Sequence, residues 1–293
     1  MFRFCRTLSL SFGHLLRSDL EVETIREQKE AMTPTAQQVD VFPQPEALTL
    51  AAAERLALLA NHAVEDHGVF TVALSGGSTP KALYELMATD DGIRGEIPWP
   101  KVHFFFGDER HVPPDHADSN FRMANDAMFR RLSPNELHVH RVLSELANAT
   151  EAAEQYESDL REFFEPRALV IEGFPRFDLI LLGMGPDGHT ASLFPNSPAL
   201  LETTRWVVAN WVEKFKTDRV TMTFPVLNSA AEVIFFVAGA EKAAVLAEVL
   251  DGTPGEATYP IQGIRPRNGI KRWMLDASAA AGIETMRAEF DRP

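Results

Sequence analysis

Short runs of almost uninterrupted apolar residues constrain the fold of this chain more than any other feature of its sequence. Four of them read VFTVAL, VHFFF, FDLILL and VIFFVA, at residues 69–74, 102–106, 177–182 and 233–238. A strand that is apolar at every position is buried on both faces, as in a parallel sheet covered by helices. Two further strand-like runs, WVVA and RVTMTF, lie at residues 206–209 and 219–224.

Helical patterns occupy the chain between these runs. In residues 46–66, Leu48, Ala52, Leu56 and Ala63 recur at helical spacing on one face. Similar patterns lie at residues 119–131, 150–164 and 240–250, and a further helix begins near Pro80. Strands that alternate with helices predict an α/β sandwich with a largely parallel central sheet.

Charge and cysteine content limit the possible partners. No apolar run approaches the roughly 20 residues of a membrane-spanning helix. The formal net charge of −14 argues against nucleic acid or anionic lipid as the main partner, although local Arg and Lys side chains can still bind a small phosphorylated substrate. Cys5 is the only cysteine, so we expect no intrachain disulfide, no Cys-based zinc site and a reducing, cytoplasmic location.

The first 31 residues differ from the rest of the chain. MFRFCRTLSLSFGHLLRSDL has three Arg and no acidic residue before Asp19, which superficially resembles a targeting peptide. Ser, Gly and His interrupt its apolar stretch, and no clean cleavage site follows. We therefore expect a disordered N-terminal extension or a start codon placed too early, with Met32 as the working start. Residues 32–293 are then expected to form a single domain.

Four loops are selected by the rule that ligands of a parallel sheet bind beyond the carboxyl ends of its strands. They cover residues 75–80, 107–114, 183–195 and 238–242, and they contain the residues most capable of chemistry. In the first loop, LSGGSTPKAL, the glycines let backbone N–H groups at a helix N-terminus approach an anion. The spacing is not that of a Walker loop. The alternative is an ordinary turn in which Ser78 or Thr79 caps the helix.

Three cations accompany the second and fourth loops and the strand-like run RVTMTF. Arg110, within FFFGDERHVPP, can meet a phosphate or a developing oxyanion. Its neighbours Glu109 and His111 are equally well explained as a salt-bridged rim. Lys242 lies in the first turn of an expected helix, where a cation opposes the helix dipole, which suggests an anionic ligand. Arg219 is expected at the start of a strand.

The third loop, LLGMGPDGHTASLFP, contains G-x-G-x-x-G at Gly183, Gly185 and Gly188. A dinucleotide site would need an acidic residue about 20 positions later, at the end of the next strand. Glu202 is the only nearby acid and precedes that strand. The turn is better explained as presenting Asp187 and His189, because a neutral imidazole with a pKa of about 6.5 suits a general base.

Two histidine features have less demanding explanations. His189 could instead cap the helix that follows it. His138 and His140, in HVH, share one face of a possible strand, but no third metal ligand is evident. We therefore expect this pair to be a surface feature and the protein to hold no metal.

Taken in order, the motifs resemble the 6-phosphogluconolactonases of the glucosamine-6-phosphate isomerase/6-phosphogluconolactonase family. They are LSGGSTP, FFFGDERHVP, LLGMGPDGHTASLFP, RVTMTFPVLN, VAGAEKA and YPIQGIRPRNGIKRWMLD, and they extend from about Val39 to Asp276. The resemblance implies a modified Rossmann-like three-layer sandwich without a nucleotide site. It also implies hydrolysis of 6-phospho-D-glucono-1,5-lactone to 6-phospho-D-gluconate with no cofactor or metal.

The same resemblance implies roles for individual residues. His189 would deprotonate the attacking water, Asp187 would orient His189 or the water, and Arg110 would stabilise the oxyanion or reach the phosphate. The groups implied to hold the 6-phosphate are Ser75, Gly76, Gly77, Ser78, Arg219 and Lys242. The expected partner is a small sugar-phosphate lactone, and the protein is expected to be a monomer or a weak homo-oligomer.

Two other functions compete with this one. A glucosamine-6-phosphate deaminase would use Asp108 as a base and would need an acid soon after His189, but none precedes Glu202. A sugar-phosphate sensor without turnover would need a helix-turn-helix segment and a basic face. The first 31 residues are too short for that segment, and the chain is acidic.

Overall fold

The computed structural model describes residues 36–133, 137–253 and 255–283. The expected extension (residues 1–31), the proposed start at Met32, and Cys5 lie outside these residues. Within the described ranges, no helix combines the length and apolar character that crossing a membrane requires.

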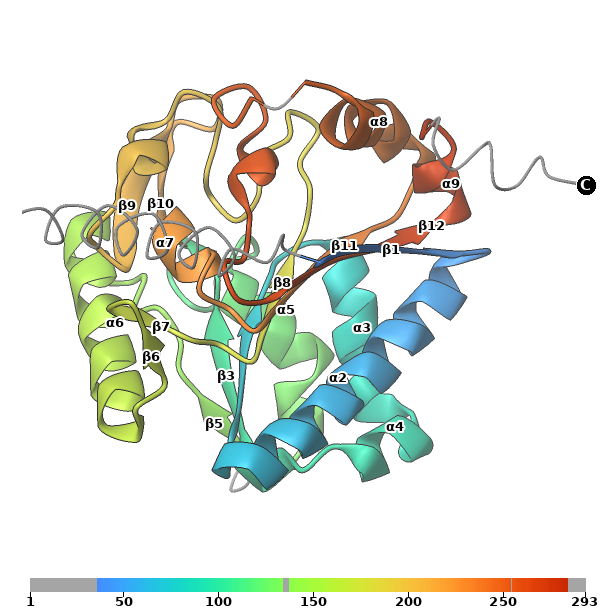
Figure 1. The fold of residues 1–293 in the computed structure, drawn as a ribbon. Coiled ribbons are helices and arrows are strands. Elements are labelled where there is room, and N and C mark those ends of the chain that lie inside the picture. Colours follow the sequence, from blue (N-terminus) through green and yellow to red (C-terminus); the bar gives the residue numbers. More distant parts are fainter. Residues whose placement is uncertain (1–35, 134–136, 254, 284–293) are drawn as a thin grey trace, which may run out of the picture. The chain divides into compact units, whose positions relative to one another are not determined.

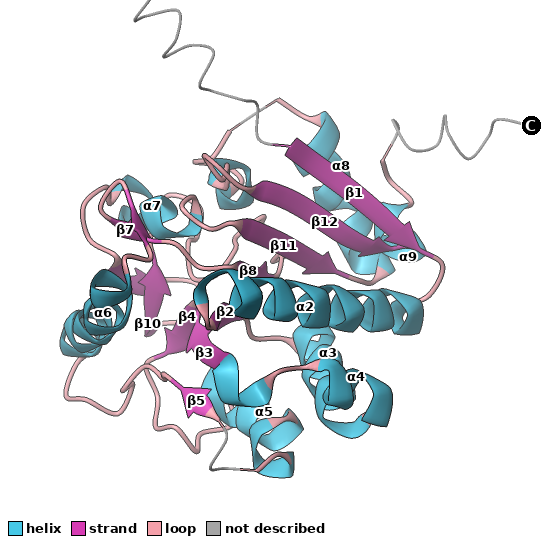
Figure 2. Ribbon diagram, turned by 60° about the horizontal axis from the view of Figure 1, so that its bottom comes forward, coloured by secondary structure: helices cyan, strands magenta, loops and turns pink. Residues whose placement is uncertain are grey.

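A seven-stranded sheet forms the centre of the described fold, and all of its neighbouring strands are parallel (Figures 1 and 2). In spatial order its strands are β1 (Ala36–Phe42), β12 (Ile270–Asp276), β11 (Glu232–Val237), β8 (Leu179–Leu182), β2 (Phe70–Leu74), β3 (Val102–Phe106) and β5 (His138–Val139). The prediction of a largely parallel sheet is confirmed, and β3 has the bounds that the run VHFFF predicted.

Helices cover both faces of this sheet, with α2 and α3 on one side and α8 on the other (Figure 1). The first face carries α2 (Pro45–His67), α3 (Ser78–Thr89), α4 (Asp91–Glu96) and α5 (Asn120–Ala127). The second face carries α6 (Ala149–Phe164), α8 (Ala243–Asp251) and α9 (Ala277–Ala280). The short helix α7 (Phe224–Leu227) follows the strand β10, described below.

Two hydrophobic cores explain why the central strands are apolar throughout. Successive side chains of a strand point to opposite faces of its sheet. Phe104 and Phe106 therefore join the core under α2, whereas Phe105 joins the core under α6. All three side chains are almost fully buried. A polar residue at any of these positions would lie in a core, so the sequence pattern determines the burial of both faces.

The prediction for two of the strand-like runs is partly wrong, because they belong to a second, three-stranded sheet. The runs at residues 206–209 and 219–224 do not join the parallel sheet but form β9 (Val207–Val212) and β10 (Thr217–Met222), which pair antiparallel. Strand β4 (Asp108–Arg110) pairs with the other edge of β10, so residues expected in a loop are also a strand. The turn of residues 213–216 that joins β9 to β10 is too short for a parallel crossover, which requires a dozen or more residues.

The start of α3 differs from the expected one. Gly77 is the N-cap residue, and no side chain caps this helix. Ser78 and Thr79 therefore lie inside the helix, and the prediction that one of them caps it is wrong. Gly77 has φ +112° and ψ 170°, a conformation that side-chain-bearing residues rarely adopt, so this turn depends on glycine.

The HVH motif is only partly a surface feature. His138 is exposed, but His140 is half-buried, and its Nε2 lies 3.0 Å from His103 Nδ1 on the neighbouring strand β3. Burial lowers the pKa of His103 to about 3 and that of His140 to about 4, so the pair is neutral at physiological pH. In the part of the chain that the structure describes, no group of three or more His, Cys, Asp or Glu could hold a metal ion.

Shorter elements complete the described chain. They are β6 (Val170–Ile171), β7 (Phe174–Pro175), and the 3₁₀ turns η1 (Trp99–Lys101), η2 (Phe129–Arg131), η4 (Glu165–Arg167), η5 (Pro198–Leu201), η6 (Ala240–Lys242) and η7 (Pro260–Gly263).

Candidate active site

A cleft of about 270 Å³ lies at the carboxyl ends of four adjacent strands, β11, β8, β2 and β3. The loops that follow these strands are the four that the sequence selected. Seven of the nine predicted site residues line the cleft: Ser75, Gly76, Gly77, Arg110, His189, Arg219 and Lys242. Asp187 and Ser78 are not among the lining residues.

His189 and Asp187 form a hydrogen-bonded pair at one side of this cleft. The Nδ1–H of His189 donates to Oδ1 of Asp187, which is how Asp187 contributes although it does not line the cleft. With Nδ1 protonated, Nε2 keeps the free lone pair that a base needs. The imidazole also stacks on Phe194, with ring centroids 4.1 Å apart, which restricts its rotation. The cap interpretation of His189 does not describe this geometry, because the residues after it form turns rather than a helix.

The protonation states of this pair follow from their surroundings. Burial lowers the pKa of His189, and the hydrogen bond to Asp187 only partly offsets that effect. Burial alone would raise the pKa of Asp187, but hydrogen bonds from His189 and Lys214 lower it to about 2. At neutral pH the pair is therefore a neutral imidazole beside an ionised carboxylate, the combination that accepts a proton most readily.

Two of the three glycines in the G-x-G-x-x-G pattern, Gly185 and Gly188, have structural reasons that involve no nucleotide. A Cβ on Gly185 would lie 2.0 Å from Nδ1 and Cε1 of His189, so only glycine leaves room for the imidazole. Gly188 has φ +68°, which allows the tight turn between Asp187 and His189. A Cβ on Gly183 would meet no atom within 4 Å.

Two arginines face each other across the second sheet. Arg110 on β4 and Arg219 on β10 are register partners, an arrangement of like charges that is unfavourable by itself. Within the described ranges neither forms an ion pair, and the buried Nε of each has no hydrogen-bond partner. Burial lowers the pKa of Arg219, an effect that the nearby Asp108 opposes. An Nη group of Arg110 donates to the backbone oxygen of Asp118. Partly buried guanidinium groups that lack a carboxylate partner and lie beside a cleft are suited to an anionic ligand.

Lys242 and the glycine turn line the cleft together with these arginines. The Nζ of Lys242 donates to the backbone oxygen of Met184 at 3.1 Å, which holds the ammonium group at the edge of the His189 loop. Ser75 is buried, and its Oγ has no hydrogen-bond partner among the described residues. Lys242 ends η6 and is the N-cap residue of α8, so it lies directly before the helix rather than in the first turn that the sequence predicted.

The interpretation of Glu109 as a rim residue is wrong. Glu109 is 1% exposed and accepts hydrogen bonds from the backbone N–H groups of Arg110, Asn120 and Phe121. Its carboxylate also accepts a hydrogen bond from the hydroxyl of Ser119, the N-cap of α5. Glu109 therefore fixes the start of α5 against β4. A helix N-terminus favours a carboxylate at this position. His111 is half-buried and is not among the residues that line the cleft; its Nε2 lies 3.0 Å from the backbone oxygen of Leu146.

Sequence reasoning gave Asp108 no part in the favoured site and did not identify Asn120 or Ser192. Asp108 and Asn120 line the cleft although each is more than nine-tenths buried. Asp108 accepts a hydrogen bond of 2.6 Å from Ser192 Oγ, and the Asn120 side-chain amide donates to its backbone oxygen at 2.9 Å. The signal in the sequence was that Asp108 and Ser192 lie within the selected loops at residues 107–114 and 183–195, whereas Asn120 lies outside all four loops.

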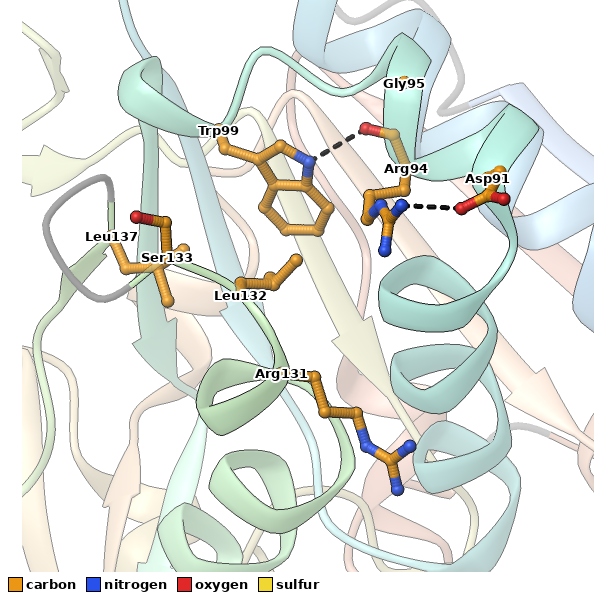
Figure 3. A pocket seen from close by; sticks show the side chains of 8 residues that line it. All are labelled: Asp91, Arg94, Gly95, Trp99, Arg131, Leu132, Ser133 and Leu137. Carbon is orange, nitrogen blue, oxygen red and sulfur yellow. Dashed lines mark hydrogen bonds and ion pairs between the residues drawn. The ribbon is translucent and has the colours of Figure 1, made fainter.

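A second hollow, of about 420 Å³, lies near the amino end of β3 and is the less suitable candidate (Figure 3). The indole of Trp99 donates to the backbone oxygen of Arg94 at 2.9 Å, and the Arg94 guanidinium donates to Asp91 at 2.6 Å. The described residues that line this hollow include no histidine. Ligand sites of parallel sheets lie at the opposite, carboxyl end of the strands, where the cleft with His189 is found.

Comparison with known proteins relates most of the chain to one family. The family described as glucosamine-6-phosphate isomerases/6-phosphogluconolactonase matches residues 43–273. A 6-phosphogluconolactonase from a Nostoc species is 41% identical over 245 residues, which cover 84% of this chain and 98% of that relative. One from a Synechocystis species is 40% identical over 248 residues, which cover 85% of this chain and 99% of the relative.

Solved structures confirm the fold that the resemblance implied. The structure of 6-phosphogluconolactonase from Trypanosoma cruzi matches with a TM-score of 0.73 and 30% identity, covering 86% of this chain and 99% of its own. The structure of the enzyme from Leishmania guyanensis matches with a TM-score of 0.74 and 30% identity, and the match covers 85% of this chain and 99% of that one. The three-layer arrangement around a parallel sheet is thus shared with these structures.

Proposed function

The chain belongs to the glucosamine-6-phosphate isomerase/6-phosphogluconolactonase family, and we propose that it hydrolyses 6-phospho-D-glucono-1,5-lactone to 6-phospho-D-gluconate. This reaction is the second step of the oxidative pentose phosphate pathway. The observation that carries the proposal is a neutral His189, held by Asp187, in a cleft that also presents Arg110, Arg219 and Lys242. A base can activate water for attack on the lactone, and cations in the same cleft can bind its phosphate.

The proposed mechanism uses His189 first as a base and then as an acid. Its Nε2 takes a proton from a water molecule as the water oxygen bonds to C1 of the lactone. The tetrahedral intermediate collapses with cleavage of the bond between C1 and the ring oxygen. The imidazolium returns the proton to that oxygen, which becomes the C5 hydroxyl of the product. Asp187 holds Nδ1–H throughout and stabilises the imidazolium.

The positively charged side chains of the cleft are proposed to bind the phosphate of the substrate and to stabilise the oxyanion. The turn of Ser75, Gly76, Gly77 and Ser78 is proposed to hold the 6-phosphate together with Arg219 and Lys242. Backbone N–H groups of the turn and the two side chains can all donate to phosphate oxygens. Arg110 adds a fixed charge for the oxyanion or the phosphate.

Glucosamine-6-phosphate deamination is the competing activity of this family. It would require Asp108 as a free base, but the Oδ2 of Asp108 accepts the hydroxyl of Ser192, and no acidic side chain follows His189 closely. To separate the two activities, the purified protein is offered each substrate, and acid release from the lactone and ammonia release from glucosamine 6-phosphate are followed. We expect acid release only. Ammonia release without lactone hydrolysis would refute the proposed function.

Residues 32–293 are proposed to act as one domain, without cofactor or metal, as a monomer or weak homo-oligomer in the cytoplasm. The single cysteine of the sequence supports a reducing compartment. Mass spectrometry of the native N-terminus tests whether the mature protein begins at Met32.

The pH dependence of hydrolysis should have an acidic limb that reports His189. Burial lowers the pKa of this imidazole below its ordinary 6.5, and only the neutral form can accept a proton. Activity is therefore expected to be full above this pKa and to be lost as the pH falls through it. Measuring kcat/KM between about pH 4.5 and 8 should give a midpoint below about 6.5. A midpoint above that value would contradict the assigned environment of His189.

Substitution Gly185→Ala should impair hydrolysis without removing any reacting group. The added Cβ would overlap the imidazole of His189 and displace it. We expect kcat to fall about 10–100-fold, because displacements near 1 Å can cost this much. NMR of the His189 ring should show a changed signal in Gly185→Ala and an unchanged one in the control Gly183→Ala, whose Cβ meets no atom. A parent-like kcat in Gly185→Ala would show that the position of the imidazole does not matter.

A further inference from the structure

The turn between β9 and β10 brings a lysine to the proposed catalytic pair. Lys214 lies in this turn, and its Nζ is 3.1 Å from Oδ2 of Asp187. The other oxygen of the same carboxylate accepts the Nδ1–H of His189. Lys214 and His189 thus bind opposite oxygens of one carboxylate, although Lys214 is 27 residues from Asp187 in sequence.

Aromatic contacts hold the turn at this place. Phe215 packs edge-on against Phe194, with ring centroids 6.0 Å apart, and Phe194 stacks on His189. The guanidinium of Arg219 lies over the Phe215 ring at 5.4 Å from its centroid. The position of Lys214 therefore follows from packing against the site itself, and not only from the attraction between Lys214 and Asp187.

Lys214 can affect His189 in two ways. By donating to Oδ2 it fixes the plane of the Asp187 carboxylate, so that Oδ1 stays directed at Nδ1 of His189. Its positive charge also opposes the formation of a second positive charge on the imidazole. In agreement, Lys214 is one of the groups that lower the pKa of His189, after the larger effect of burial.

We propose that Lys214 is a positioning residue of the hydrolytic site, which aligns Asp187 with His189 and disfavours the imidazolium, so that His189 remains a competent base in mildly acidic conditions. This inference rests on the proposed role of His189 as the base. Lys214 itself need not touch the substrate, because it acts through Asp187.

Other charged groups lie around His189 besides Lys214, and two of them also shift its pKa. Asp187 and Asp108 raise the pKa of His189, in opposition to Lys214. Arg110, Arg219 and Lys242 line the same cleft. The remaining charges of the turn, Glu213 and Lys216, form an ion pair with each other.

The test compares Lys214→Met with Lys216→Met, which removes the same charge from the same turn but leaves the contact with Asp187 intact. In Lys214→Met the acidic limb of kcat/KM should move to higher pH by about 0.3–0.5 units, as expected for a half-exposed charge pair. Activity on that limb should fall about two- to threefold. Lys216→Met and the conservative Lys214→Arg should keep the limb of the parent protein.

Salt provides a second readout, because ions screen exposed charges. The difference between Lys214→Met and the parent should shrink at about 1 M salt, where the Debye length is about 3 Å. The proposal is overturned if the limb of Lys214→Met coincides with that of the parent at low salt, or if Lys216→Met moves it equally far.

Direct NMR titration of the His189 imidazole in the parent and in Lys214→Met separates this proposal from the proposed function. If Lys214→Met leaves the titration midpoint unchanged, the present inference fails, whatever the role of His189. A second outcome is that the titration midpoint rises in Lys214→Met but His189→Ala keeps full activity. Lys214 would then still affect the pKa of His189, but His189 would not be the base, and Lys214 would have no role in catalysis.

Discussion

Replacement of His189 by alanine is expected to lower kcat for lactone hydrolysis about 10²–10⁴-fold, the usual contribution of a general base. The variant should keep KM within a few-fold of the parent value, because the groups proposed to bind the phosphate are unchanged. Among the described residues, His189 is the only histidine that lines the cleft, so no other imidazole of this lining can replace it. Steady-state kinetics, corrected for spontaneous hydrolysis, provide the measurement.

Two controls make the result specific to the base. His62→Ala removes an exposed histidine of α2 and should leave kcat unchanged. Added imidazole should restore part of the activity of His189→Ala, because the missing group can then diffuse into the cleft. A sensor protein would keep its biological function after His189→Ala, whereas a hydrolase keeps binding and loses turnover. Parent-like kcat in His189→Ala would make the proposed mechanism wrong.

Substitution of Lys242 by methionine is expected to weaken binding of the phosphorylated substrate. Methionine keeps much of the length of the side chain but removes the charge that the structure holds beside Met184. Loss of one charge-assisted hydrogen bond, worth about 1.5–3 kcal/mol, corresponds to a rise in KM of about 10–100-fold. The value of kcat should change much less, because the His189–Asp187 pair is untouched.

The same variant can be tested on a substrate without phosphate. D-Glucono-1,5-lactone lacks the group that Lys242 is proposed to bind, so parent and Lys242→Met should hydrolyse it with similar kcat/KM. Lys81→Met is the matched control, because Lys81 is an exposed lysine of α3 outside the cleft, paired with Glu85. Equal losses on both lactones would show that Lys242 does not recognise the phosphate.

The parallel sheet could be predicted only where its strands are apolar on both faces. Strand β3 was predicted with its observed bounds, because each of its two faces meets a hydrophobic core. Strands β1 and β12 were missed, because they contain polar residues such as Gln38 and Arg272. The guanidinium of Arg272 is paired with Glu232 at 2.8 Å and with Asp40 at 2.6 Å, contacts that no local pattern reveals.

Local sequence patterns also failed to predict how two strands pair and where one helix starts. The runs that became β9 and β10 were predicted as strands, but their hydropathy does not identify their partners. Their antiparallel pairing follows from a short turn and from the pairing of β10 with β4. At α3 the glycine turn was predicted to bind an anion, which stays a prediction. The start of the helix depends on the backbone conformation of Gly77, which neither Ser78 nor Thr79 determines.

The candidate site was largely predictable because one topological rule selects the loops. Strands β11, β8, β2 and β3 are neighbours, so the loops at their carboxyl ends must meet, and most of the predicted residues do line one cleft. Lys214 could not be predicted, because its approach to Asp187 depends on the packing of Phe215 against Phe194. The hydrogen bonds of Asp108 and Asn120 could not be predicted either, because sequence periodicity does not identify the partners of a buried polar residue.

The most direct test of the central claim is a coupled assay of the purified protein. Glucose-6-phosphate dehydrogenase generates the lactone in place, and formation of 6-phosphogluconate is then followed with and without this protein. We expect 6-phosphogluconate to form faster than by spontaneous hydrolysis, in proportion to the amount of protein added. A rate equal to the spontaneous one, from protein whose circular dichroism shows that it is folded, would contradict the proposed function.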